Sequence, residues 1–172
     1  MNISYTSREQ VDVYRFSWPV AIGVPILAIV VQAWVPTRLT FVKVFDFPML
    51  VTIFFAVSRR NPASGSILGA VIGLTQDALT HLKVGLFGIA NTVIGYVASS
   101  LGVKIDVDNP GSRFIMTFVF YVLHQLVYFT VARGLVGETI LWYWGHEIGA
   151  ALANSLMAVV LFALLDRFKI RT

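Results

Sequence analysis

An apolar segment of the chain, Ser64 to Leu79, carries a glycine at every fourth position before an aspartate. The residues at this spacing are Gly65, Gly69, Gly73 and Asp77. Positions four apart share one face of a helix, and inside a membrane glycines at this spacing let two helix backbones approach closely. A carboxylate on the same ridge has to face protein or a wet cavity, because lipid does not solvate it. The segment therefore predicts a membrane helix bundle with a polar point inside it.

The composition favours an integral membrane protein over a soluble one. Hydrophobic residues make up 57% of the 172 residues and charged residues 13%, with a mean hydropathy of +0.77, whereas soluble domains contain about 25% charged residues. The net charge of +4 comes from Lys and Arg scattered at the ends of apolar runs. This distribution is typical of membrane orientation and argues against a nucleic-acid-binding surface. Without cysteine, disulfides and thiolate chemistry are excluded.

The order of apolar runs predicts an all-α integral membrane domain of six transmembrane helices over residues 16–165. The runs are Phe16 to Val35, Asp46 to Ser58, Ser64 to Leu79, Val84 to Val103, Phe114 to Ala132 and Ile148 to Leu165. The second and third are short for a ~30 Å hydrocarbon core, so we expect longer ends or shelter by neighbouring helices. Pro19 and Pro25 are expected to bend or interrupt the first run. Asp46, followed by Pro48, predicts a helix cap.

The positions of Lys and Arg predict the orientation. They are enriched in residues 1–15, 59–63, 104–113 and 166–172 relative to the alternate loops, which places both termini in the cytoplasm, with 1–15 and 166–172 as cytoplasmic segments. Arg59 and Arg60 lie in the shortest of these loops and are expected to help determine the topology. The aromatic run of Trp142, Tyr143 and Trp144 then lies at the outer membrane–water interface.

Small and polar residues also follow single faces of the fourth and fifth runs. The fourth carries Gly88, Thr92, Gly95, Ser99 and Gly102, and the fifth carries Thr117, Tyr121, His124 and Tyr128, with Gln125 adjacent. The glycine stripes predict either close internal packing or a face for a second subunit or a partner helix. The polar face of the fifth run predicts either hydrogen bonds between helices or a ligand pocket. Asn91 and Asn154 are interpreted as amides that join helices.

Asp77 should have a polar partner. The candidates are Tyr96, Asn91, His124, Tyr121 and His81, or the free N–H groups that open the fourth run near Gly85. Proteolysis by paired aspartates would use Asp46 with Asp77, but the surrounding residues carry no supporting signature. The histidines His81, His124 and His146 lack metal-ligand spacing. We therefore expect no metal, no cofactor and no enzymatic activity.

The segment from Asp46 to Gly102 resembles the family of the bacterial rod shape-determining protein MreD. The residues that carry the resemblance are Asp46, Arg59, Arg60 and Pro62, the glycine ladder through Gln76 and Asp77, Gly85 with Leu86, and Gly95 with Tyr96. The family's residues, carried over to this chain, are Asp46, Gly69, Gly73, Asp77, Gly85 and Tyr96. Two departures are Phe45, where the family often has Pro, and the loop His81 to Lys83, which is usually richer in small residues.

The resemblance implies a non-enzymatic subunit of the cell-elongation machinery in the bacterial inner membrane. Its implied partner is the bitopic protein MreC, and through MreC the peptidoglycan polymerase and transpeptidase and the MreB filaments. Membrane lipids are further expected partners, and the glycine stripes leave open a homodimer with a second copy of the chain. The family is also similar in predicted architecture to the S-components of energy-coupling-factor transporters. That similarity implies an alternative function, in which Asp77, Tyr96, Tyr121 and His124 line a pocket for a small or lipid-linked ligand.

Overall fold

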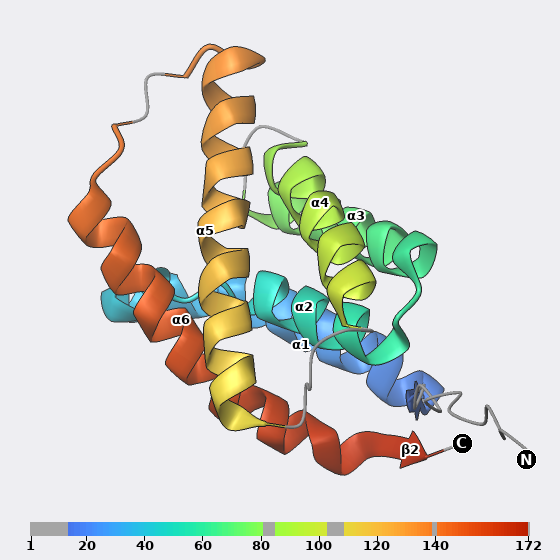
Figure 1. The fold of residues 1–172 in the computed structure, drawn as a ribbon. Coiled ribbons are helices and arrows are strands. Elements are labelled where there is room, and N and C mark those ends of the chain that lie inside the picture. Colours follow the sequence, from blue (N-terminus) through green and yellow to red (C-terminus); the bar gives the residue numbers. More distant parts are fainter. Residues whose placement is uncertain (1–13, 81–84, 103–108, 139–140, 172) are drawn as a thin grey trace, which may run out of the picture.

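The computed structural model describes residues 14–80, 85–102, 109–138 and 141–171, and in these residues the fold is almost entirely helical (Figure 1). Six α-helices follow one another in the order of the predicted runs. They are α1 (Trp18–Arg38), α2 (Phe47–Arg59), α3 (Pro62–Leu79), α4 (Leu86–Leu101), α5 (Pro110–Gly134) and α6 (Trp144–Leu165). Two short 3-10 helices, η1 (Thr40–Val44) and η2 (Asp166–Phe168), and two strands, β1 (Tyr14–Phe16) and β2 (Lys169–Arg171), complete the described elements.

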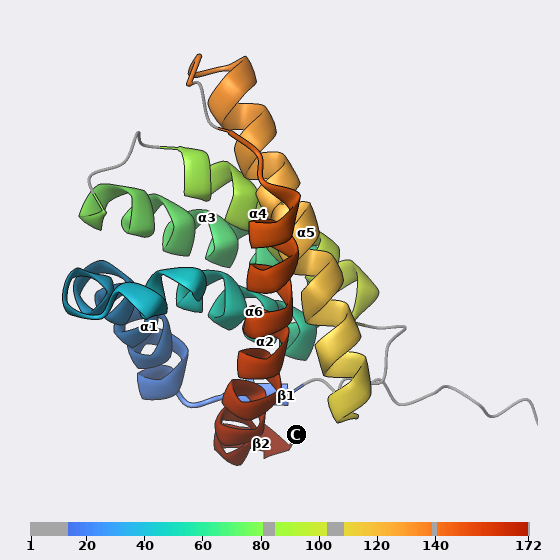
Figure 2. The ribbon, with the colours of Figure 1, turned by 90° about the vertical axis from the view of Figure 1, so that its left-hand side faces the viewer.

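Three of the six helices are long and apolar enough to cross a membrane. These are α1, α5, and α6 with its continuation into η2. The apolar helices α2 and α4 are shorter, and in α3 glycines and polar residues such as Gln76 and Asp77 lower the apolarity. Figure 2 shows α2 and α3 running across the direction of α6. The chain is therefore a helical protein with three candidate membrane spans, and the six-span arrangement stays a prediction.

Helix α2 lies at the centre of the fold. Every residue from Pro48 to Ser58 is buried, and the ring of Phe54 packs against Phe162 of α6 with centroids 5.4 Å apart. The neighbouring helices therefore enclose this short helix, which agrees with the shelter expected for the second run. A helix of 13 residues reaches only about 20 Å, which is short of a ~30 Å hydrocarbon core.

The two ends of the described chain pair with each other. β1 and β2 run antiparallel, with Phe16 opposite Lys169, and lie at one end of the molecule (Figure 1). Residues 14 and 15 were predicted in the N-terminal segment 1–15, Phe16 at the start of the first apolar run and Lys169–Arg171 in the C-terminal tail, so the strands are a correction. The Phe16 ring packs 4.8 Å from that of Phe55, and this burial holds the ribbon against α2. Both described ends therefore lie on the same side of the fold.

Several predicted boundaries shift. α1 continues without interruption through Pro25 and Pro36, and Pro19 occupies its first turn, where a missing N–H is tolerated. α5 begins at Pro110 because Asn109 caps it, so residues 110–113, expected in a loop, are helical. Val84 and Val103, the predicted limits of the fourth run, lie outside the described residues, as do most of residues 1–15 and 104–108.

Candidate functional site

The carboxylate of Asp77, fully buried near the end of α3, caps the start of α4. Its Oδ2 accepts hydrogen bonds from the backbone N–H groups of Gly85 at 2.8 Å and Gly88 at 3.0 Å, and its Oδ1 accepts one from Phe87 at 3.1 Å. Of the partners that the sequence suggested for Asp77, the structure therefore shows the free N–H groups near Gly85. Tyr96, Asn91, Tyr121 and His124 do not bond to Asp77, and His81 lies outside the described residues.

Gly85 makes this capping geometry accessible. Its φ is +109°, a conformation that residues with a Cβ adopt only with strain. The turn at Gly85 directs the first N–H groups of α4 toward α3. A negative charge at a helix N-terminus also interacts favourably with the helix dipole. Asp77 and Gly85 therefore act as one capping unit.

The glycine ladder is the contact surface between α3 and α4. A Cβ added at Gly65 would overlap the Gly95 carbonyl, one at Gly69 would overlap the Asn91 carbonyl, and one at Gly73 would overlap the Phe87 carbonyl. From the α4 side, Gly95 meets the Gly65 backbone and Gly88 meets the Leu74 side chain. Within the chain these glycines are used for internal packing, the first of the two interpretations.

A buried amide pair extends the contact. The Asn91 Nδ2 donates to the Gln76 Oε1 at 3.2 Å, and both side chains are buried. Asn91 thus joins α4 to α3, as expected of an amide between helices. Tyr96 is different: it was predicted among the buried polar groups, but it is 55% exposed. It follows Gly95 by one residue, and a rotation of about 100° per residue turns it away from α3.

The polar face of α5 contacts the cap of α2, the start of α6 and also Phe87 of α4. His124 is fully buried, stacks on Phe87 with centroids 5.9 Å apart, and places its Nδ1 4.0 Å from the Asp46 Oδ2. Asp46 caps α2 by accepting from the Met49 N–H at 3.1 Å. Tyr121 accepts from the Gln125 Nε2 at 3.2 Å. These residues lie on one face of α5, as their spacing predicts, whereas their partners on other helices follow only from the structure.

Asn154 of α6 also bonds to the segment that contains Asp46. Its Oδ1 accepts from the Asp46 N–H at 2.9 Å, and its Nδ2 donates to the Val44 carbonyl at 2.7 Å. The amide therefore holds the segment before α2 against α6, more than 100 positions away in the sequence. This agrees with its interpretation as an amide that joins helices.

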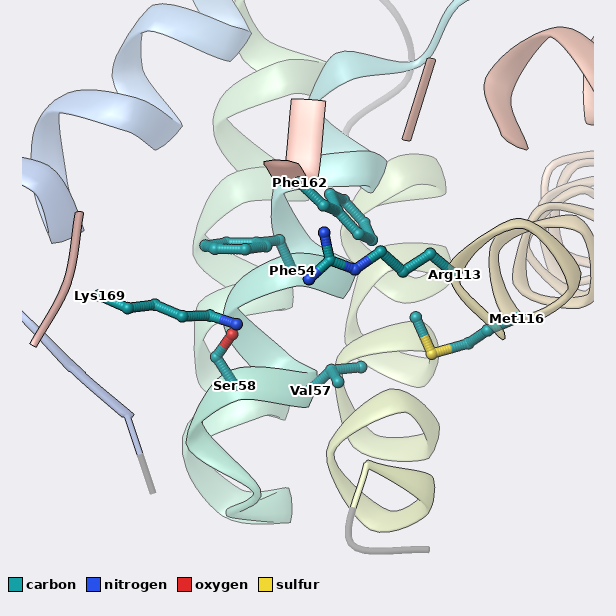
Figure 3. Close-up of a pocket in the computed structure, with 7 residues that line it drawn as sticks. All are labelled: Phe54, Val57, Ser58, Arg113, Met116, Phe162 and Lys169. Carbon is teal, nitrogen blue, oxygen red and sulfur yellow. The ribbon is translucent and has the colours of Figure 1, made fainter. Parts of the chain in front are cut away.

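A second buried charge, Arg113 of α5, was not found from the sequence. It is 5% exposed and pairs with Asp166, whose Oδ1 lies 2.7 Å from the Lys169 Nζ. Figure 3 shows the Arg113 guanidinium reaching between Phe54 and Phe162, beside a cavity of about 10 Å³. A local sequence signal was present: Asn109 followed by Pro110 is typical of a helix start. A helix that begins there includes Arg113 in its first turns, whereas the sequence analysis had left Arg113 in a loop.

Arg59 and Arg60 end α2 at the turn into α3. Arg60 has φ +52°, the left-handed geometry that closes a helix, and Asn61 then caps α3 by accepting from the Ser64 N–H at 3.1 Å. The Arg59 guanidinium lies 5.8 Å from the centre of the Phe55 ring. These contacts make a tight turn with two cations, and their effect on topology remains a prediction.

No protein-family model, curated protein or solved structure matches this chain. What the site does chemically follows from its own contacts. The oxygens of Asp77 are occupied by three backbone donors, and Tyr96 is turned outward. Two of the four residues of the ligand-pocket alternative therefore do not face a shared opening, and the arrangement is suited to holding helices in fixed positions.

Proposed function

We propose that the chain is a non-enzymatic inner-membrane subunit of the bacterial cell-elongation complex, of the MreD type. It binds the transmembrane helix of MreC and through MreC influences the peptidoglycan polymerase and transpeptidase and the MreB filaments. Its six helices lie in the membrane with both termini in the cytoplasm. In this role the polar interior makes the bundle rigid, and an outer apolar surface binds the partner.

The observation that carries the proposal is the use of Asp77. A ligand-binding carboxylate needs free oxygens directed at a cavity, whereas the Asp77 oxygens are held by the N–H groups of Gly85, Phe87 and Gly88. The residues of the resemblance with packing roles, Gly69 and Gly73, lie on the same helix contact. These features support a scaffold rather than a small-molecule receptor.

The surface that best suits a partner helix is a groove between α3 and α4. It has a volume of about 250 Å³ and is lined by Ala70, Leu74, Gly85, Gly88, Ile89, Thr92 and Val93. Small residues at such a surface let a second helix approach closely. Tyr96, the exposed residue of the resemblance, lies on the same side of α4, because it follows Ile89 and Val93 at helical spacing. We therefore place MreC in this groove.

Co-purification of MreC tests the proposal. The chain and tagged MreC are co-expressed, extracted in a mild detergent and captured through MreC, and the retained chain is quantified. Ile89→Trp fills the groove, and Tyr96→Ala removes an exposed aromatic ring on the same side of α4. Each variant should lower retention several-fold. Val160→Trp, at an exposed position of α6, is the matched control and should be retained like the parent.

Three outcomes contradict parts of the proposal. No retention of the parent chain rejects binding to MreC, and equal retention of both groove variants rejects the groove as the docking surface. A small molecule that stays bound to the purified parent, and is lost from Tyr121→Phe, favours the alternative of an S-component-like ligand pocket. Restoration of rod shape in depleted cells by the parent, but not by the groove variants, would link binding to function.

A further inference from the structure

His124 of α5 lies between the start of α2 and the start of α4. Its ring stacks on Phe87 of α4, with 5.9 Å between the ring centroids and 18° between their planes, and its Nδ1 lies 4.0 Å from the Oδ2 of Asp46, the cap of α2. We call these three residues the His124 junction. The His124 side chain is fully buried, and neither ring nitrogen has a hydrogen-bond partner among the described residues. A neutral imidazole has one donor and one acceptor nitrogen, and at this junction both are unused.

The polar groups nearest to His124 are held by other bonds. The Asp46 Oδ1 accepts from the Met49 N–H at 3.1 Å, and the Asp46 N–H donates to the Asn154 Oδ1 at 2.9 Å. The Gln125 Nε2 donates to the Tyr121 hydroxyl at 3.2 Å and to the Glu147 Oε2 at 3.0 Å. Asp46 is therefore fixed by the α2 cap and by α6, at a distance from His124 that is too long for a hydrogen bond.

Charged and titratable side chains surround the His124 junction on several elements. They are Asp46 at the α2 cap, Asp77 of α3 beyond Phe87, Tyr121 and Tyr128 of α5, His146 and Glu147 of α6, and the exposed Lys43 of η1. Helix α4 carries no charged residue. Asp46 is the group at ion-pair distance from His124, whereas Glu147 bonds to Gln125 instead. The response of His124 to pH therefore depends mainly on its burial and on Asp46.

Protonation of His124 adds a charge where the native packing offers no hydrogen-bond acceptor. Both ring nitrogens of an imidazolium are donors, and water would bond to each of them. Asp46 at 4.0 Å supplies attraction but no hydrogen bond, so it offsets only part of the cost of removing the charge from water. For a direct bond, the ring has to leave Phe87 or Asp46 has to leave the α2 cap.

We propose that the His124 junction is an acid-sensitive switch, in which protonation of His124 from the outer side separates α5 from the starts of α2 and α4. At neutral pH the ring is uncharged and the three elements stay packed. In acid the α2 cap and the first turn of α4 loosen, because Asp46 and Phe87 are the contacts that the charged ring disturbs. This inference does not depend on the proposed binding of MreC.

The position of the junction favours the outer side as the source of the proton. Asp46 and the start of α6 lie toward the outer face in the predicted orientation. A series of polar contacts leads inward from His146, whose side chain is 66% exposed, to Glu147 at 3.3 Å and then to Gln125 and Tyr121. Tyr121 precedes His124 by three residues, so the two lie on one face of α5.

A chain with His124 as its single histidine tests the proposal. The sequence contains three histidines, so the full chain with His81→Gln and His146→Gln is the reference protein, and addition of His124→Phe gives the matched control. The unfolding equilibrium constant is measured in detergent by circular dichroism at pH 7.5 and pH 5.5. A histidine that is protonated only in the unfolded chain, where its pKa is about 6.5, raises this constant about ten-fold between the two pH values.

The reference protein should show this ten-fold rise, and the control should show none. Asp46→Asn in the reference protein keeps a capping oxygen and removes the nearby negative charge, so the rise should be at least as large. Hydrogen exchange, corrected for its intrinsic pH dependence, locates the change. In the reference protein at pH 5.5 it should be several-fold faster in residues 46–52 and 86–91, and unchanged in residues 62–69 of α3.

The proposal is overturned if the unfolding constant of the reference protein is equal at both pH values, or if the control shows the same rise. A lower constant at pH 5.5 also overturns it, because His124 would then form a stabilising ion pair with Asp46 in place. Should His124→Phe fail to fold, nitrogen NMR of the reference protein with labelled histidine decides the question. A His124 ring that titrates near pH 6.5 in the folded protein contradicts the proposal, and one that stays neutral at pH 5.5 supports it.

Discussion

The Asp77 carboxylate accepts a hydrogen bond of 2.8 Å from the Gly85 N–H, eight residues further along the chain. This bond joins the end of α3 to the start of α4 across the connecting residues. It also places the free N–H groups of α4 inside the protein, where they need an acceptor. The stability of the α3–α4 pair should therefore depend on the Asp77 oxygens.

Asp77→Ala is expected to lower the free energy of unfolding by about 3 kcal/mol, because three donors lose a charged acceptor. Asp77→Asn keeps one acceptor oxygen and the shape of the side chain, so it should lose only about 1 kcal/mol. Unfolding in detergent, followed by circular dichroism, measures both. Equal stability of parent and Asp77→Ala would mean that the N–H groups find another acceptor.

Gly85→Ala is expected to destabilise the protein by about 1–2 kcal/mol, although a Cβ at this position meets no other atom. The cost arises from the backbone, since φ is +109° and a Cβ strains this conformation. Gly149→Ala in α6, which also has open space, is the control and should be neutral or slightly stabilising. A loss as large in the control would point to lost flexibility rather than to strain at Gly85.

Gly69→Ala and Gly73→Ala should each destabilise the protein by about 3 kcal/mol, because the new Cβ overlaps the α4 backbone and the helices must move apart. Gly145→Ala, where a Cβ has no neighbour, separates this effect from a general effect of alanine. The melting temperature in detergent is the measurement. If Gly69→Ala and Gly73→Ala are both as stable as the parent, the glycine ladder faces lipid and does not pack against α4.

Asp166→Asn is expected to cost about 2 kcal/mol, because the buried Arg113 loses a carboxylate partner while Asp166 itself is only partly buried. The double variant Arg113→Met with Asp166→Asn should lose less than the sum of the single variants, since the two residues are in contact. Thermal unfolding of the parent, Arg113→Met, Asp166→Asn and the double variant gives the double-mutant cycle. Additive losses would show that the pair is not coupled.

Cysteine labelling tests the topology, because the chain contains no cysteine. Asn61 and Gly145 are both exposed and lie on opposite predicted sides of the membrane. A membrane-impermeant maleimide added to intact spheroplasts should label Gly145→Cys and leave Asn61→Cys unlabelled. The reverse pattern would invert the orientation. Transferring the charges of Arg59 and Arg60 to residues 80–83 should weaken the insertion of α2 and α3.

Local sequence patterns predicted the helices and several of their ends. The spacing of apolar residues and the Lys and Arg between them predicted six helices in the correct order, because these signals depend on neighbours within a few residues. Asp46 before Pro48 predicted the cap of α2 for the same reason. The α5 start was missed, although Asn109 and Pro110 form an equally local signal.

The sequence by itself determined that this chain is helical, apolar enough for a membrane, and built with a small-residue ridge that ends in a carboxylate. Only the tertiary structure decided which group meets Asp77, that Tyr96 faces outward, and that Arg113 pairs with Asp166. The pairing of β1 with β2 also belongs to this class. The physical reason is that a periodic pattern specifies the face on which a side chain lies, whereas its partner depends on which distant segments pack against that face.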